Sequence, residues 1–202
     1  NRNTAFNPFT IEGKKTVAFE LIKQLNFSVP DRIFVPVGDG VIISGVYKGF
    51  EDLLKLKIIN NMPCIVGVQA AKSNNLIRNI NQVKFKIEKS STIADSISVD
   101  IPRNFFMTQK FLNEYNGELI SVSDDEIINA SSILSKNTGL FAEPAAAAAF
   151  AGLLSYQKNH KLTENSNNVV LLTGSGLKDL KSVENILKMP SAIKPNIENL
   201  KL

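Results

Sequence analysis

The chain has 202 residues, of which 44% are hydrophobic and 21% are charged, and its formal net charge at pH 7 is +4. Such a composition is typical of an ordinary soluble domain with one sizeable core, and no apolar stretch is long enough to cross a bilayer. The basic residues are scattered without a long block, so the charge indicates neither a nucleic-acid partner nor a membrane surface.

The first half of the sequence predicts a strand–helix–strand unit. Residues 14–25 place apolar side chains on one helical face, and Pro30 follows this helix. Residues 33–37 form an apolar run that predicts a strand, and a glycine loop and a helical stripe come after it. Residues 64–69 are almost entirely apolar, as expected for a parallel strand that is buried on both faces.

The second half continues the alternation of helices and strands. Residues 70–100 have weak periodicity, which predicts a helix together with irregular chain. The later elements are a helix at 105–115, a strand at 118–122, a helix from a capping box at 123–126 to about residue 137, a helix that begins at Pro144 and a strand at 168–173. We therefore predict an α/β fold with a mostly parallel, twisted sheet flanked by helices, and with ligands at the carboxyl ends of its strands.

Cysteine and histidine are too scarce for several common kinds of site. Cys64 is the only cysteine, so it cannot form an intramolecular disulfide, and its apolar surroundings predict a structural role. His160 is the only histidine and lies in a polar segment at the expected end of a helix. We expect neither a metal site nor a serine–histidine nucleophile. Because no signal peptide is visible, the cytoplasm is the expected location.

Two glycine loops follow strands and are expected at the same edge of the sheet. The first, Gly38-Asp39-Gly40, leads into a helix, where unpaired backbone N–H groups and the helix dipole favour an anion. It is not a P-loop, and it lacks the last glycine of G-x-G-x-x-G because Ile43 stands there. The loop is therefore either a phosphate cradle or a plain connection.

The second loop, residues 173–179, carries a hydroxyl group at its start. A nucleophile-elbow interpretation of Ser175 fails because the flanking glycines of G-x-S-x-G are replaced, so we interpret Ser175 as a turn residue. Thr173 either ends the strand or presents its hydroxyl to a ring nitrogen in the crevice. Glu143, just before Pro144, either points into the crevice or caps the next helix.

Segments spread along nearly the whole chain resemble threonine synthase, a branch of the fold type II pyridoxal phosphate enzymes. They occur in the same order as in that family, at residues 7–20, 35–40, 65–70, 141–145 and 172–179. The last of them, Thr-Gly-x-Gly-Leu-Lys-Asp, favours threonine synthase over the serine and threonine dehydratases. The resemblance implies the large-domain fold of those enzymes and pyridoxal 5′-phosphate as the cofactor.

The resemblance also implies roles for particular residues. Thr173 would contact the pyridine nitrogen of the cofactor, and Glu143 would lie near its ring. Backbone N–H groups of the first loop would hold the cofactor phosphate, namely those of Gly38, Asp39, Gly40, Val41 and Ile42. Many relatives have a further glycine and then Asn or Thr where this chain has Val41 and Ile42, so a side-chain donor to the phosphate is lost here.

The Schiff-base lysine of the family has no match in this sequence. In the family it lies in an N-terminal segment, and Lys14 and Lys15 are downstream of that place. We therefore expect residues 1–202 to be a single α/β domain, the C-terminal part of the large cofactor-binding domain, without the N-terminal segment and the small domain. No catalytic residue is expected in the chain itself, and whether it binds pyridoxal phosphate without the lysine is left open.

The implied function is that of a C-terminal fragment of a threonine synthase. The parent enzyme, a carbon–oxygen lyase acting on phosphates in threonine biosynthesis, would convert O-phospho-L-homoserine and water to L-threonine and phosphate, and the fragment alone would be inactive. Two alternatives stay open, another enzyme of fold type II, such as a dehydratase or cysteate synthase, and a noncatalytic domain that binds a phosphorylated metabolite. An exposed cleft face and sheet edge predict a homodimer or a self-associating fragment.

Overall fold

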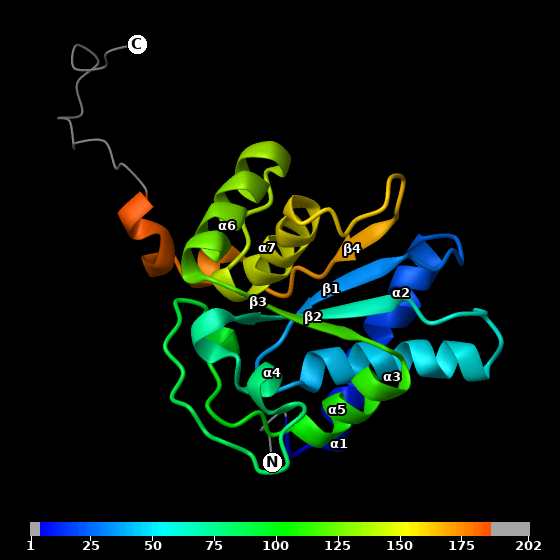
Figure 1. Ribbon diagram of the computed structural model, residues 1–202. Coiled ribbons are helices and arrows are strands. Elements are labelled where there is room, and N and C mark those ends of the chain that lie inside the picture. Colours follow the sequence, from blue (N-terminus) through cyan, green and yellow to red (C-terminus); the bar gives the residue numbers. More distant parts are fainter. Residues whose placement is uncertain (1–4, 187–202) are drawn as a thin grey trace.

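A computed structural model describes residues 5–186 and shows, within them, a four-stranded sheet in the order β3-β2-β1-β4 (Figure 1). The strands are β1 (Arg32–Pro36), β2 (Cys64–Ala70), β3 (Glu118–Val122) and β4 (Asn168–Val170). Every pair is parallel, and Phe34 of β1 lies opposite Val66 of β2 and Val170 of β4. The predicted fold class, a mostly parallel α/β sheet flanked by helices, is confirmed.

The strand order places a topological switch between β1 and β4. From β1 the chain crosses through α3 (Val41–Lys55) to β2 and then reaches β3, whereas β4 returns to the other side of β1. The connections that leave the carboxyl ends of β1 and β4 therefore diverge, which opens a crevice at that point. The two glycine loops predicted from the sequence follow these two strands.

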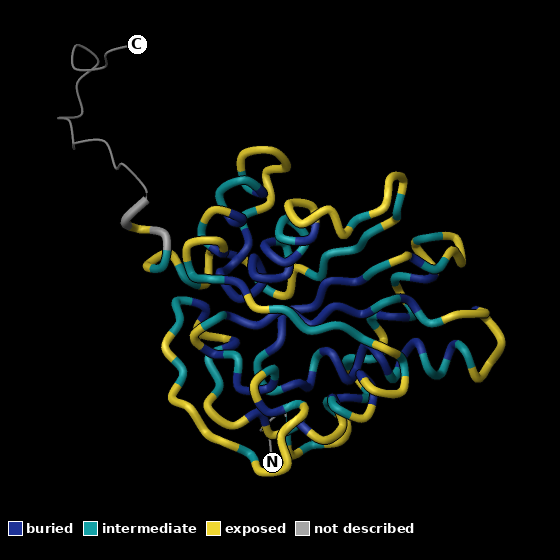
Figure 2. Tube along the Cα trace, viewed as in Figure 1, coloured by how far each residue is buried: buried dark blue, intermediate teal, exposed yellow. Residues whose placement is uncertain are grey.

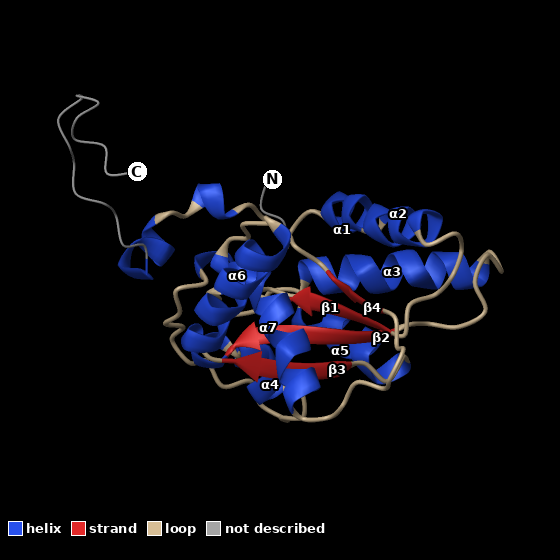
Figure 3. Ribbon diagram, turned by 90° about the horizontal axis from the view of Figure 1, so that it is seen from above, coloured by secondary structure: helices blue, strands red, loops and turns tan. Residues whose placement is uncertain are grey.

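Helices cover both faces of the sheet. On one face lies α7 (Pro144–Lys158), backed by α6 (Asp124–Thr138). On the other lies α3, which packs against α1 (Pro8–Lys14), α2 (Thr16–Gln24) and α5 (Phe105–Glu114) (Figures 1 and 3). The two central strands, β1 and β2, are almost entirely buried between the layers, whereas the outer strands β3 and β4 are mostly half-buried (Figure 2). The helix α7 lies close to β2 at Gly152, where an added Cβ would be only 2.5 Å from Val68 Cγ2.

The N-terminal helix differs from the prediction. Instead of one helix over residues 14–25, the chain forms α1 (Pro8–Lys14) and α2 (Thr16–Gln24). The Asn7 side chain accepts a hydrogen bond from the N–H of Phe9, and Pro8 takes the first helical position, where its missing N–H costs nothing. The sequence therefore contained the earlier start signal, which the periodicity alone did not indicate.

The last strand is shorter than predicted. β4 ends at Val170 instead of Thr173, although the N–H of Leu171 still donates to the carbonyl of Phe34 at 3.0 Å. Beyond it the chain leaves the sheet, and Ser175 pairs with Ala142 instead. The predicted capping box is confirmed, because Ser123 and Glu126 exchange hydrogen bonds at the start of α6.

Residues 70–100 contain the short helix α4 (Asn75–Asn79) and a long irregular stretch, in agreement with the prediction. Two buried asparagines replace the hydrogen bonds that regular structure would supply. Asn75 accepts from the N–H of Glu88 and donates to its carbonyl, and Asn79 makes the same two bonds with Lys86, at 2.7–3.1 Å. These amide pairs hold the irregular stretch against the domain.

The single cysteine should be poorly reactive in the folded protein. Cys64 lies at the amino end of β2, where burial, and next the neighbouring Glu118 carboxylate, raise the pKa of its thiol to about 11 from 9.0. The thiolate fraction at pH 8 is then roughly a hundredfold smaller than for the unperturbed thiol. We expect iodoacetamide, followed by mass spectrometry, to label native Cys64 about a hundredfold more slowly than the urea-unfolded chain.

The raised pKa of the Cys64 thiol also makes the free energy of unfolding decrease at alkaline pH. Below about pH 9 the thiol is protonated in both states, so its contribution to stability is fully present. Between pH 9 and 11 the unfolded chain loses the proton first, so the free energy of unfolding falls as the pH rises. Equal rates of iodoacetamide labelling for the native and the urea-unfolded chain would contradict the raised pKa of the Cys64 thiol.

Candidate functional site

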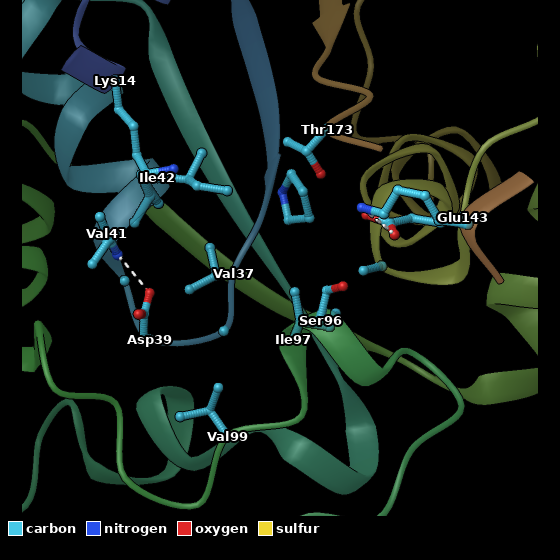
Figure 4. Close-up of a pocket in the computed structure, with 16 residues that line it drawn as sticks. Lys14, Val37, Asp39, Val41, Ile42, Ser96, Ile97, Val99, Glu143 and Thr173 are labelled. Atoms are coloured by element: carbon cyan, nitrogen blue, oxygen red, sulfur yellow. Dashed lines mark hydrogen bonds and ion pairs between the residues drawn. The ribbon is translucent and has the colours of Figure 1, made fainter. Parts of the chain in front are cut away.

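A cavity of about 240 Å³ lies at the carboxyl ends of β1 and β4 (Figure 4). It brings together all the residues that the sequence analysis selected for the cofactor, which are Gly38, Asp39, Gly40, Val41, Ile42, Glu143 and Thr173. About a hundred residues separate the loop after β1 from Glu143, and Thr173 follows thirty residues later; the switch between β1 and β4 brings these segments together. Convergence of this kind at a switch point is typical of ligand sites in α/β proteins.

The first glycine loop has the geometry of an anion-binding helix start. Gly40 has φ 89° and ψ 0° and is the N-cap of α3, a conformation that favours glycine. The first N–H groups of α3 have no carbonyl one turn earlier and point out of the helix end. One of them, the N–H of Val41, donates to Asp39 Oδ1 at 3.0 Å (Figure 4).

A buried polar network on α5 supports this loop from behind. The carbonyl of Gly40 accepts from Asn104 Nδ2 at 3.0 Å and from Thr108 Oγ1 at 3.1 Å. Asn104 also donates to Ser44 Oγ at 2.7 Å, and its N–H donates to the carbonyl of Asp39 at 3.0 Å. The loop is therefore fixed by hydrogen bonds from a second helix, which makes it a preorganised feature of the fold.

Backbone hydrogen bonds join the segment that contains Glu143 to the loop that follows Thr173. The N–H of Glu143 donates to the carbonyl of Gly174 at 3.1 Å, next to the bridge between Ala142 and Ser175. Glu143 stands at the N-cap position of α7, but its side chain makes no capping hydrogen bond. Of the two possibilities left open by the sequence, the structure therefore places the Glu143 side chain in the cavity wall.

The wall contains an ion pair between Glu143 and Lys178. Lys178 Nζ lies 2.9 Å from Glu143 Oε2, and the side chains are 60% and 7% exposed respectively. Thr173 lies between this pair and the start of α3 in Figure 4. The cavity thus has the N-terminus of α3 on one side and a hydroxyl and an ion pair on the other.

Several lining residues were not predicted. Ser96, Ile97 and Val99 come from the irregular stretch, where no periodic pattern indicates which residues face a site. Ser73 positions them, because its hydroxyl donates to the carbonyl of Ile97 at 2.9 Å and accepts from the N–H of Val99 at 3.0 Å. Lys14 also lines the cavity, and nothing in its sequence context indicated this.

Other site types find no support in the part of the chain that the structure describes. Within residues 5–186, no three His, Cys, Asp or Glu side chains are grouped so as to hold a metal ion. Cys64 begins β2 and therefore lies at the opposite end of the sheet from the cavity. None of the described helices is both long and apolar enough to cross a membrane.

The chain is similar to known enzymes over most of its length. The family described as pyridoxal-phosphate dependent enzyme matches residues 1–174. A threonine synthase of Methanosarcina acetivorans is 34% identical over 200 residues, which are 98% of this chain and 49% of that protein. A threonine synthase of Methanocaldococcus jannaschii is 35% identical over 178 residues, which are 87% of this chain and 44% of that protein.

Solved structures share the fold. The processed form of threonine deaminase isoform 2 from Solanum lycopersicum superposes with a TM-score of 0.74 at 22% identity, covering 89% of this chain and 49% of that one. An L-serine ammonia-lyase from Rhizomucor miehei superposes with a TM-score of 0.69 at 24% identity, covering 84% of this chain and 53% of that one. At such identities the likeness concerns the fold alone.

The family match and the curated relatives agree with the resemblance that the sequence motifs indicated. The chain spans about half the length of the curated relatives it matches. The family match covers most of the chain, including the loop after β1, Glu143 and Thr173, and it implies pyridoxal phosphate as the cofactor. The chain belongs to the family of pyridoxal-phosphate dependent enzymes.

Proposed function

We propose that this chain is the C-terminal part of the large domain of a threonine synthase, which converts O-phospho-L-homoserine and water to L-threonine and phosphate. The observation that carries the proposal is the convergence of the loop after β1, Glu143 and Thr173 on one cavity. These segments are among those that resemble threonine synthase, and curated relatives with that name are about 35% identical across most of the chain.

The loop after β1 fits the phosphate group of the cofactor. A Cβ at Gly38 would lie 3.0 Å from Ile97 Cα and 3.1 Å from Val99 Cγ2, so any larger residue would crowd the cavity wall. The N–H of Val41 donates to the Asp39 carboxylate at 3.0 Å, so an anionic oxygen already lies at this helix start. Gly38, Asp39, Gly40, Val41 and Ile42 would hold the phosphate through their backbone N–H groups.

The opposite side of the cavity fits the ring of the cofactor. Thr173 would offer its hydroxyl to the ring nitrogen as an uncharged partner. Glu143 would lie beside the ring, where its ion pair with Lys178 holds the carboxylate in one orientation. When bound, pyridoxal phosphate supplies an electron sink for the elimination and replacement steps at the substrate.

Part of the site would come from elsewhere in the parent enzyme. Because nothing in the chain matches the Schiff-base lysine motif, we place that lysine and most substrate contacts outside residues 1–202. The predicted self-association also stays a prediction. Leu140, Leu172 and Leu177, which are 54%, 37% and 74% exposed, line a hollow beside the site where such contacts would form.

Cofactor binding and phosphate release together test the proposal. We expect the 202-residue chain to bind pyridoxal phosphate, measured by an absorbance titration, without sustained phosphate release from O-phospho-L-homoserine. A full-length protein that contains the chain should release phosphate from O-phospho-L-homoserine, and should form little 2-oxo acid from threonine or serine. Sustained phosphate release by the chain alone would contradict the assignment of the lysine to another segment.

The other outcomes favour the alternatives. Formation of a 2-oxo acid from threonine, without phosphate release from O-phospho-L-homoserine, would favour a dehydratase. Binding of inorganic phosphate without pyridoxal phosphate would favour a noncatalytic domain for a phosphorylated metabolite. The apolar Val41 and Ile42 side chains at the loop favour this last alternative.

A further inference from the structure

The phosphate side of the cavity lacks a side-chain donor on its own loop. Val41 and Ile42 begin α3 and carry only apolar side chains, and Asp39 adds a carboxylate beside the N–H of Val41. A phosphate bound there would carry about two negative charges next to that carboxylate. Backbone N–H groups and the helix dipole offset part of this repulsion, so a nearby cation would strengthen binding.

Lys14 approaches the cavity from a different helix. It is the last residue of α1 and packs directly on α3, because a Cβ at Gly45 would lie 2.6 Å from Lys14 Cβ. Figure 4 shows the Lys14 side chain extending toward Ile42, and Lys14 is among the residues that line the cavity. The contact with Gly45 thus places the Cβ of Lys14 over the first turns of α3.

The ammonium group of Lys14 is available for a ligand, whereas its neighbours are engaged. Lys15 binds Asp52 at 2.8 Å and Glu12 at 2.7 Å, and Lys48 binds Glu12 at 3.0 Å. Between residues 5 and 186, no carboxylate lies within ion-pair distance of Lys14 Nζ. On the other side of the cavity, Lys178 is paired with Glu143.

We propose that Lys14 is a phosphate-binding residue of this site. Its Nζ donates to a phosphate oxygen of the bound cofactor and replaces the side-chain donor that Val41 and Ile42 cannot provide. The inference rests on the proposed function, since it takes the occupant of the loop to be the cofactor phosphate. It adds a contact from α1 to a cradle that the sequence placed entirely in the loop after β1.

A pair of probes isolates the phosphate contribution. Pyridoxine 5′-phosphate and pyridoxine differ only in the phosphate and carry no aldehyde, so neither can form a Schiff base with any lysine. We expect Lys14→Gln to weaken binding of pyridoxine 5′-phosphate by about tenfold, measured by calorimetry, as for loss of one charge-assisted hydrogen bond. Binding of pyridoxine should change less than twofold.

Matched variants separate charge from packing. Lys14→Arg keeps the charge and should retain most of the affinity, and Lys23→Gln removes an exposed lysine on α2 and should have no effect. The affinity of the unmodified chain should also decrease more steeply with salt than that of Lys14→Gln. Unchanged melting temperatures for Lys14→Gln and Lys14→Arg would show that both variants fold.

Each remaining outcome decides between the two proposals. Equal affinity of the unmodified chain and Lys14→Gln for pyridoxine 5′-phosphate would overturn the role of Lys14 and leave the proposed function intact. Failure of the unmodified chain to bind pyridoxine 5′-phosphate would count against the proposed function. In that case, a titration with inorganic phosphate, monitored by the amide NMR shifts of Gly38 and Gly40, tests Lys14 directly. Shift changes that are identical in the unmodified chain and Lys14→Gln, or absent from both, would overturn the role of Lys14.

Discussion

Replacing Gly40 by alanine is expected to lower the free energy of unfolding by about 3 kcal/mol, with a loss of ligand binding. Gly40 has φ 89°, which a side chain disfavours, and its Cβ would clash with Thr108 Oγ1. The clash displaces the hydroxyl that donates to the carbonyl of Gly40 and disturbs Asn104, which donates to the same carbonyl. Urea unfolding followed by circular dichroism measures the change.

Gly139 provides the matched control for Gly40. It also has a positive φ, 74°, but a Cβ at this position would meet no atom within 4 Å. Gly139→Ala should therefore cost only the backbone strain, about 1 kcal/mol, and leave ligand binding unchanged. Similar losses in the two variants would show that the network on α5 adds nothing to the rigidity of the loop.

The second large effect is expected at the crossing of α2 and α3. A Cβ at Gly49 would clash with the carbonyl oxygen of Lys15 and lie 2.7 Å from Ala18 Cβ. The backbone of α2 cannot yield as a flexible side chain can, so Gly49→Ala must separate the helices and should cost about 2 kcal/mol. Thermal and urea unfolding of the variant measure this loss.

Gly13 shows what the same substitution does on an open helix surface. It lies inside α1, and a Cβ there would meet nothing within 4 Å. Because alanine favours the helix more than glycine does, Gly13→Ala should raise the free energy of unfolding by about 0.5–1 kcal/mol. A destabilised Gly13→Ala would contradict the open surface at this position of α1, and a neutral Gly49→Ala would contradict the close packing of α2 on α3.

Local sequence signals predicted most of the fold. The apolar runs at 33–37 and 64–69 correspond to β1 and β2, and the capping box at Ser123 begins α6. These features depend on hydrogen bonds and side-chain spacing within a few residues, which the sequence displays directly. The errors, a merged α1 and α2 and an overlong β4, occur at element boundaries, where neighbouring segments decide how far a helix or strand continues.

The candidate site was only partly predictable for the same reason. The glycine loops, Glu143 and Thr173 were selected from motifs that each lie within one short segment. Ser96, Ile97 and Val99 were not, because the Ser73 hydroxyl and the Asn75 amide position their stretch through contacts that leave no periodic signal. Cavity walls built from irregular chain need the tertiary structure to be recognised.

The sequence by itself determined the α/β class, the glycine loops and the family with its cofactor, because these depend on local patterns and on motifs that stay together along the chain. Only the tertiary structure decided that β4 lies beside β1, that Glu143 pairs with Lys178 and that Lys14 reaches the start of α3. Contacts between distant segments follow from strand order and helix packing over the whole sheet, and no local pattern encodes them.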